Sequence, residues 1–267
     1  MLKKASGVLA MVIAMSASGF AAAADKVTYQ LDWLPGGDKA PVYAGIQQGF
    51  FADEGLEVTV ASGRGSTDAI TKIATGQADI GSADIGALMA ARAQDTVPVS
   101  AVYMIFNQGP HAFFALSDSG INSFTDIAGK KVATSPFTSS NAFLPLVLEA
   151  NSMPADSVSL TKSDPGALGP MLVTGNTDAI IAWVTNIALF KQQAAAAGKD
   201  INVIRWSDAG LSLYSSAVVA ADKFLTERPD VAKRFMRAYD KSLRFTHEHP
   251  ELEAADLHTM VPEVDAA

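Results

Sequence analysis

The chain has 267 residues, 49% of them hydrophobic and 18% charged, which is the composition of a globular protein with one large or two modest domains. It has 28 acidic against 20 basic residues and no basic run of five or more, which disfavours binding to nucleic acid or to an anionic membrane. The absence of cysteine excludes disulfide bonds, thiolate metal sites and a cysteine nucleophile.

The first 24 residues have the order of a cleaved secretory signal. Lys3 and Lys4 form a basic start, an apolar run follows at residues 7–15, and alanines occupy residues 22–24. Because no cysteine is available for lipid attachment, we expect a free exported protein in a periplasm. The alternative is a permanent N-terminal anchor, for which the apolar run is short. Residues 1–24 contain two lysines and no acid, so the remainder carries 18 basic and 28 acidic residues and a formal charge of −10.

Strands and helices alternate along the rest of the chain. Strands are predicted at residues 27–31, 56–60, 78–82, 97–106, 112–116, 131–134, 158–161, 178–182, 201–206 and 214–221. Helices are predicted at 41–48, 67–75, 85–94, 141–150, 165–174, 187–197, 229–249 and from 251 onward. This order indicates an α/β fold with mainly parallel sheets that have helices on both faces.

The stretch from residue 31 to 51 joins a strand end, a Gly/Pro loop and a helix. Asp32, Trp33, Lys39 and Tyr43 lie around this loop. Open α/β sheets bind ligands at the carboxyl ends of their strands, so these side chains are candidates for a binding site. The alternative is that both aromatic residues belong to the core.

A glycine-rich loop at residues 62–66 precedes the next predicted helix. Ser66 is the expected N-cap of that helix, and Arg64 lies within the loop. The loop has the glycines of an anion cradle but lacks the lysine of a nucleotide-binding loop. It therefore indicates either a site for a small anionic or polar group or an ordinary capped helix start. Asp84 is the expected cap of the following helix, and Asn107 opens the loop at residues 107–110.

The second half of the chain offers a matching loop at residues 135–141. Ser135, Thr138 and Ser139 place three hydroxyl groups just ahead of a helix, which favours a binding role over simple capping. Trp183 follows the predicted strand at 178–182 and could face Trp33 across a flat ligand.

One short pattern occurs twice. TGQADI at residues 75–80 reappears as TGNTDAI at residues 174–180, 99 residues later, and each copy ends a helix with glycine and enters a strand through aspartate. This repetition indicates two similarly built lobes, each with its own sheet. The alternative is coincidence of common turn chemistry.

The histidines do not indicate a metal site. His247 and His249 are two residues apart and cannot share one helical face, so a solvated helix end is favoured. His111 follows Pro110 at the expected lobe crossing, where we favour a residue on the hinge surface over a ligand contact. The chain has no nucleotide-binding, zinc-protease or serine-hydrolase motif, and we expect no catalysis, metal or cofactor.

Several motifs resemble the periplasmic substrate-binding proteins of ABC importers, in the branch that handles thiamine-pyrimidine precursors, nitrate, taurine and alkanesulfonates. They are LDWLP at residues 31–35 with Tyr43, GFFxxEGL at 49–56, GQADIG at 76–81 and DIxGKKV at 126–132. The resemblance implies a type II periplasmic-binding-protein fold whose ligand cleft lies between two lobes. After the signal peptide at residues 1–24, lobe 1 would cover 25–107, lobe 2 would cover 108–208, and residues 209–267 would return to lobe 1.

By the same resemblance, the chain is the monomeric solute-binding component of an ABC importer, delivering a small heterocycle or organic anion to a membrane permease. The family's binding positions would fall on Asp32, Trp33, Lys39, Tyr43, Arg64, Asp84, Asn107, Ser135, Thr138, Ser139, Trp183 and Tyr214. Aromatic residues would form walls, and Lys39 and Arg64 would contact a carbonyl, carboxylate or sulfonate.

The chain departs from the family pattern in three ways. The pyrimidine-binding branch has asparagines after the proline and a histidine at the position of Lys39, where this chain has Gly36, Asp38 and lysine. Family members also continue for several dozen residues beyond a segment like 261–264, so the chain looks truncated at its C-terminus. Two alternatives stay open: a pyrimidine-synthase-like enzyme, which needs that histidine and a cysteine-rich motif, and a periplasmic sensor for a membrane kinase. In the enzyme, Lys39 could form a Schiff base with an aldehyde cofactor.

Overall fold

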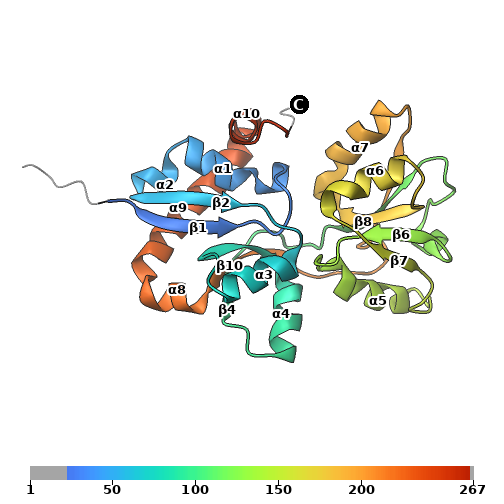
Figure 1. Ribbon diagram of the computed structural model, residues 1–267, viewed down its shortest axis with the longest axis horizontal. Coiled ribbons are helices and arrows are strands. Elements are labelled where there is room, and N and C mark those ends of the chain that lie inside the picture. Colours follow the sequence, from blue (N-terminus) through green and yellow to red (C-terminus); the bar gives the residue numbers. More distant parts are fainter. Residues whose placement is uncertain (1–22, 265–267) are drawn as a thin grey trace, which may run out of the picture.

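The computed structural model describes residues 23–264, and the expected signal peptide at residues 1–24 lies almost wholly outside them. Two lobes lie side by side, each a five-stranded sheet with helices packed against it (Figure 1). The prediction of a two-lobed α/β fold is confirmed. Among the described helices, none is both long and apolar enough to span a bilayer.

The first sheet has the strand order β2-β1-β3-β10-β4. Its strands are β1 Asp25–Gln30, β2 Leu56–Ala61, β3 Ile80–Asp84, β4 Val99–Met104 and β10 Ser216–Ala221. Its helices are η1 Gly37–Lys39, α1 Ala40–Gln47, α2 Phe50–Asp53, α3 Ser66–Ala74, α4 Ile85–Gln94, α8 Asp222–Glu227, α9 Pro229–Glu248 and α10 Pro250–Met260. Strand β10 runs antiparallel to both of its neighbours, whereas β1 is parallel to β2 and β3.

The second sheet has the strand order β7-β6-β8-β5-β9. Its strands are β5 His111–Leu116, β6 Lys131–Thr134, β7 Ser159–Lys162, β8 Ala179–Trp183 and β9 Ile201–Arg205. Its helices are η2 Phe124–Ile127, α5 Ser140–Ala150, η3 Pro165–Ala167, α6 Leu168–Val173, η4 Val184–Asn186 and α7 Ile187–Ala196. Strand β5 is antiparallel to both neighbours, so each sheet has one reversed strand, the one that follows a crossing between the sheets.

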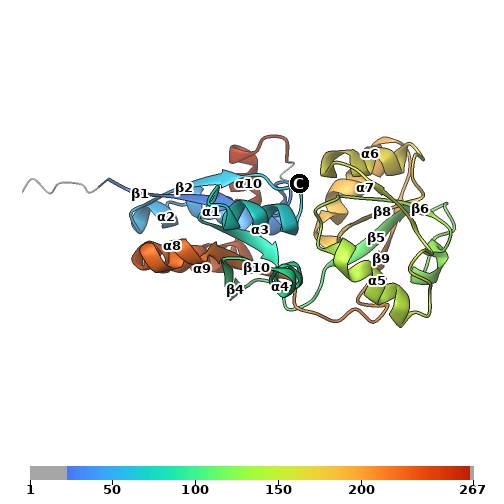
Figure 2. The same ribbon diagram turned by 60° about the horizontal axis from the view of Figure 1, so that its bottom comes forward.

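The chain passes from the first sheet to the second between β4 and β5, and it returns between β9 and β10. Figure 2 shows both connections running between the lobes. Strand β10 begins at Ser216, two residues later than the predicted start at Tyr214, because the chain is still crossing there. Trp206, at the start of this return, is fully buried in the second lobe.

Each lobe has its own core. In the first lobe Tyr29, Phe235 and Tyr239 stack on one another, with ring centroids 5.7 to 6.0 Å apart. In the second lobe, consecutive side chains of β5 point to opposite faces of the sheet. Phe113 therefore packs on Trp206, and Phe114 packs on Phe190 on the other face.

The repeated TG…D pattern plays the same structural role in both lobes. Gly76 and Gly175 end helices α3 and α6 with φ angles of 77° and 74°, a region that favours glycine. Asp79 then exchanges two hydrogen bonds with the backbone of Thr28: its N–H donates to the carbonyl, and its carboxylate accepts from the amide at 2.8 Å. Asp178 makes the same pair of bonds with a residue of β6. The repetition thus marks the pairing of a helix-linked strand with its parallel neighbour.

Candidate ligand-binding cleft

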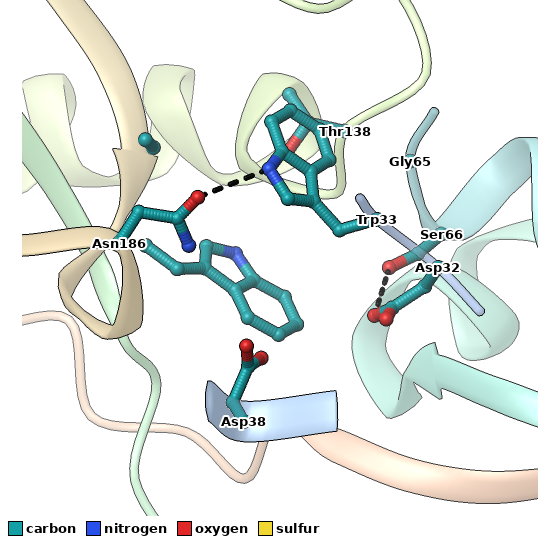
Figure 3. A pocket seen from close by; sticks show the side chains of 9 residues that line it. Asp32, Trp33, Asp38, Gly65, Ser66, Thr138 and Asn186 are labelled. Carbon is teal, nitrogen blue, oxygen red and sulfur yellow. Dashed lines mark hydrogen bonds between the residues drawn. The ribbon is translucent and has the colours of Figure 1, made fainter. Parts of the chain in front are cut away.

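A pocket lies where the strands of the two sheets end and face each other across the cleft (Figure 3). Its lining residues are Asp32, Trp33, Asp38, Gly65 and Ser66 of the first lobe, and Thr138, Ala182, Trp183 and Asn186 of the second. The enclosed cavity measures about 10 Å³, which is room for about one water molecule. The lobes are therefore shut on each other in this structure.

Direct hydrogen bonds join the lobes around this pocket. Trp33 Nε1 donates to Asn186 Oδ1 at 3.1 Å, and Figure 3 shows the amide pointing at the indole ring. On another side of the pocket, the carbonyl of Phe137 accepts from both the amide and the hydroxyl of Thr67, at 3.1 and 2.8 Å. Thr67 lies in the first turn of α3, so the second lobe satisfies a helix N–H that has no intrahelical partner.

Ser66 does not cap helix α3 as predicted; that prediction is wrong. The N-cap position belongs to Gly65, and Ser66 is the first helical residue. Its hydroxyl is used inside the first lobe, where it accepts from the Asp84 amide at 3.0 Å and donates to Asp32 Oδ2 at 3.4 Å. The role of the missing cap falls to the carbonyl of Phe137.

Lys39 does not line the pocket itself but is held between two carboxylates that do. Its ammonium is 2.6 Å from Asp32 Oδ1 and 2.8 Å from Asp38 Oδ2, and its side chain is 3% exposed. Burial lowers the pKa of Lys39, but the charges and hydrogen bonds of Asp32 and Asp38 outweigh it and raise the pKa above its ordinary value. The same ammonium lies 5.0 Å from the ring centre of Trp183, a cation–π contact between the lobes.

Asp84 is fully buried beside the crossing between lobes. It caps helix α4 as predicted, because Oδ1 accepts from the Gly86 amide at 2.8 Å. Its other oxygen accepts from Ser215 Oγ at 2.6 Å and lies 3.5 Å from Nε2 of His111. Burial raises the pKa of Asp84, but the nearby His111 ring and the hydrogen bonds from Ser215 and Gly86 outweigh it and lower the pKa below its ordinary value.

His111 is not on the hinge surface; that prediction is wrong. The side chain is buried at the start of β5, where it belongs to the second lobe and contacts the first. Its Nδ1 is 2.9 Å from Ser140 Oγ, and its ring packs against Trp183 and Trp206. His247 and His249 are exposed at the end of α9, as expected for a solvated helix end.

The hydroxyls of the second-lobe loop have separate uses. Ser135 Oγ donates to the carbonyl of Arg64 at 2.6 Å and so joins the lobes. Thr138 lines the pocket, and Ser139 Oγ is buried without a hydrogen-bond partner in the described part of the chain. Trp183 Nε1 is also buried and unpartnered there.

Eight of the twelve candidate residues do not line the pocket: Lys39, Asp84, Ser135 and Ser139, and also Tyr43, Arg64, Asn107 and Tyr214. Tyr43 packs in the first-lobe core, where burial and then the charge of Glu263 raise its pKa to about 12. Tyr214 is 61% exposed on the return crossing. Asn107 lines a separate cavity of about 350 Å³ at the hinge. The Arg64 side chain is 51% exposed and pairs with Asp68 at 2.9 Å.

Five residues that line the pocket are not predicted as site residues by the sequence: Asp38, Gly65, Ser66, Ala182 and Asn186. Asp38 stands out only as a departure from the family pattern, although it precedes Lys39 directly. Gly65 is recognisable only as one glycine of an anion cradle, and Asn186 carries no signal. Within residues 23–264, no three histidine or acidic side chains are grouped closely enough to hold a metal ion.

The family profile described as NMT1/THI5 like matches residues 37–253. The chain belongs to the NMT1/THI5-like family. The formylaminopyrimidine-binding protein of Halalkalibacterium halodurans is 27% identical over 86% of this chain and 68% of its own length. The 4-amino-5-hydroxymethyl-2-methylpyrimidine phosphate synthase of Legionella pneumophila is 26% identical over 85% and 71%. Riboflavin-binding protein RibY of Chloroflexus aurantiacus is 25% identical over 87% and 65%.

Solved structures share the fold. The alkanesulfonate-binding protein SsuA of Xanthomonas axonopodis pv. citri superposes with a TM-score of 0.72 at 14% identity, over 90% of this chain and 80% of that one. The nitrate-binding protein NrtA of Synechocystis PCC 6803 gives 0.67 at 15% identity, over 89% and 67%. The expected resemblance to periplasmic binding proteins is confirmed, and at these identities the likeness to solved structures is one of fold.

Proposed function

We propose that this chain is an extracytoplasmic solute-binding protein that closes its two lobes on a small, flat heterocyclic solute. The observation that carries the proposal is the pocket between the lobes, where Trp33 of one lobe and Trp183 of the other are both lining residues. Aromatic rings give large apolar contact to a planar ligand, and the few polar groups around them fix its orientation.

Ligand entry requires the lobes to part. The cavity of about 10 Å³ is far smaller than the roughly 300 Å³ or more of usual ligand sites. Parting would break the contacts of Trp33 with Asn186 and of Thr67 with Phe137, while the two connections between the sheets act as the hinge. A bound solute would take up the space between the indoles and allow closure around it.

The proposed setting is a periplasm, with delivery to the permease of an ABC importer by a monomer. The basic, apolar and small-residue order at the N-terminus supports export. Structural neighbours include a periplasmic aliphatic sulphonate-binding protein of Escherichia coli and the ligand-binding component of an ABC-type import system of Staphylococcus aureus. Relatives named for formylaminopyrimidine and riboflavin favour a nitrogen heterocycle as the solute.

A second candidate is an enzyme, since several relatives are named as pyrimidine phosphate synthases. In such an enzyme Lys39 would have to attack an aldehyde cofactor as a free amine. Its position between Asp32 and Asp38 instead holds it as an ammonium, which is not a nucleophile. Adding pyridoxal phosphate to the purified protein should therefore give no aldimine absorbance. An aldimine band that disappears in Lys39→Met would favour the enzyme.

The binding proposal is tested by mass spectrometry of small molecules released from the purified protein, followed by a thermal-shift panel. We expect a stoichiometric nitrogen heterocycle that raises the melting temperature and changes tryptophan fluorescence. The fluorescence change should be lost in Trp33→Phe and Trp183→Phe. It should persist in Trp206→Phe, because that indole is buried in the second-lobe core. Turnover of the released compound would overturn the binding-protein assignment.

A further inference from the structure

The charged groups at the pocket come from one short segment of the first lobe. Asp32 and Asp38 line the pocket, and Lys39 contacts both beneath it. Two carboxylates and one ammonium leave an excess of one negative charge in their ionised forms. Arg64 does not change this sum, because its guanidinium pairs with Asp68 and stacks on Phe137 away from the pocket.

The two carboxylates differ in how fully they are used. Both oxygens of Asp32 have partners: Oδ1 accepts from Ser82 Oγ at 2.9 Å and from the lysine, and Oδ2 accepts from Ser66 Oγ at 3.4 Å. Asp38 gives Oδ2 to Lys39, and its Oδ1 has no hydrogen-bond partner among residues 23–264. Figure 3 shows the Asp38 side chain projecting from η1 into the space between the lobes. The pocket thus offers one free carboxylate oxygen as an acceptor.

The opposite lobe supplies a donor. Trp183 lines the pocket, and its Nε1 is buried with no partner in the described chain. A buried polar atom left unpaired costs free energy, so a ligand atom that accepts from this N–H is favoured. An acceptor oxygen on one lobe and a donor N–H on the other suit a solute with both an N–H group and an acceptor atom.

We infer that this cleft selects uncharged or cationic solutes that carry an N–H donor, and that Asp38 is the residue that determines this selectivity. The inference rests on the proposed solute-binding function and assigns the charge class of its ligand. Lys39 is then an internal counter-ion, not the receptor for a carboxylate or sulfonate that the sequence suggested. An anion would meet excess negative charge in a site closed to water, where such repulsion is weakly screened. It could draw on Lys39 only in competition with carboxylates 2.6 and 2.8 Å from the ammonium.

Matched pairs of probes that differ only in charge test the inference. Isothermal titration calorimetry would compare riboflavin with riboflavin 5′-phosphate, and 4-amino-5-hydroxymethyl-2-methylpyrimidine with its phosphate ester. We expect the uncharged member of a pair to bind at least about 10-fold more tightly. Tighter binding of the phosphate ester, or binding of nitrate or an alkanesulfonate, would overturn the inference while leaving the binding function intact. Failure of every probe to bind would count against both the charge selectivity and the proposed solute-binding function.

The substitution Asp38→Asn tests the contribution of Asp38 to this selectivity. The variant removes the excess negative charge. It should therefore reduce the ratio of the affinities for the uncharged and the phosphorylated member of a pair by about 10-fold. Asp53→Asn is the matched control, because that carboxylate is on the first lobe and 71% exposed. An unchanged ratio in Asp38→Asn, with a thermal melt showing that the variant is folded, would remove Asp38 from this role.

Discussion

Gly65 is the position where one methyl group should prevent closure. It lies at the N-terminus of α3 with a φ angle of 151°, and a Cβ built there would be 2.1 Å from the carbonyl carbon and oxygen of Phe137 and 2.6 Å from the Thr138 amide. All three are backbone atoms of the second lobe, so no side chain can rotate away. Gly65→Ala should therefore force the lobes apart at this seam, the contact of residues 65–67 with residues 137–138.

The size of the effect follows from the hydrogen bonds that hold this seam closed. The Phe137 carbonyl accepts two hydrogen bonds from Thr67, which contribute about 1 kcal/mol each. Steric overlap adds about 1 kcal/mol or more. Destabilising the closed state by about 3 kcal/mol weakens apparent ligand affinity about 100-fold, because binding needs that state.

The assay is titration calorimetry with the solute released from the wild-type protein, together with small-angle X-ray scattering. We expect a larger radius of gyration for Gly65→Ala in the presence of solute. Gly76→Ala is the matched control: its φ angle is 77°, and nothing lies within 4 Å of the added carbon. It should lose about 1 kcal/mol of stability and keep its affinity. Wild-type affinity and scattering in Gly65→Ala would refute closure at this seam.

Four further substitutions test polar and charged groups of the two lobes. Trp33→Phe removes the N–H that Asn186 accepts, and calorimetry should show affinity about 5-fold to 10-fold weaker, with a similar loss in Asn186→Ala. Lys39→Met leaves two buried carboxylates unpaired and should cost about 3–5 kcal/mol in urea unfolding at pH 8, but less at pH 5, where a carboxylate can take up a proton; equal losses at both pH values would contradict the buried pairing. Burial raises the pKa of Glu253 to about 7 from an ordinary 4.5, so wild-type stability should fall as pH rises between these values. Since this carboxyl is half-exposed, Glu253→Gln should gain only about 1 kcal/mol at pH 8 and nothing at pH 4 in the same urea assay.

The alternation of strands and helices was predictable because local signals agree with the global fold. Gly76 and Gly175 end their helices, and the following aspartates pair with a neighbouring strand, so a short local pattern carried long-range information. The exact starts of the strands were harder to predict from the sequence. Tyr214 looks like part of a strand, yet it lies on the crossing, because the partner strands end before it.

The candidate site was predictable where a residue directly follows a strand. Asp32 and Trp183 lie at the carboxyl ends of β1 and β8, and the topology alone brings such positions to the cleft. Tyr43, a candidate from the helix after this loop and from the family resemblance, does not line the pocket. The 3-10 turn Gly37–Lys39 leads directly into α1, on which Tyr43 packs in the first-lobe core. Asn186 belongs to another such turn, and its contact depends on how far the lobes close.

For Lys39, the sequence predicts the position of the residue but not its role. Its place beside the strand end brought it to the cleft, and a lysine in a cleft ordinarily suggests an anionic ligand. The structure adds Asp32 and Asp38 at 2.6 and 2.8 Å, and the negative charge of these two carboxylates exceeds the positive charge of the ammonium. The charge available to a ligand is therefore set by the carboxylate left over, not by the cation. Asp38 on η1 therefore supplies both the second carboxylate that holds the buried lysine and the excess negative charge on which the proposed preference against anions rests.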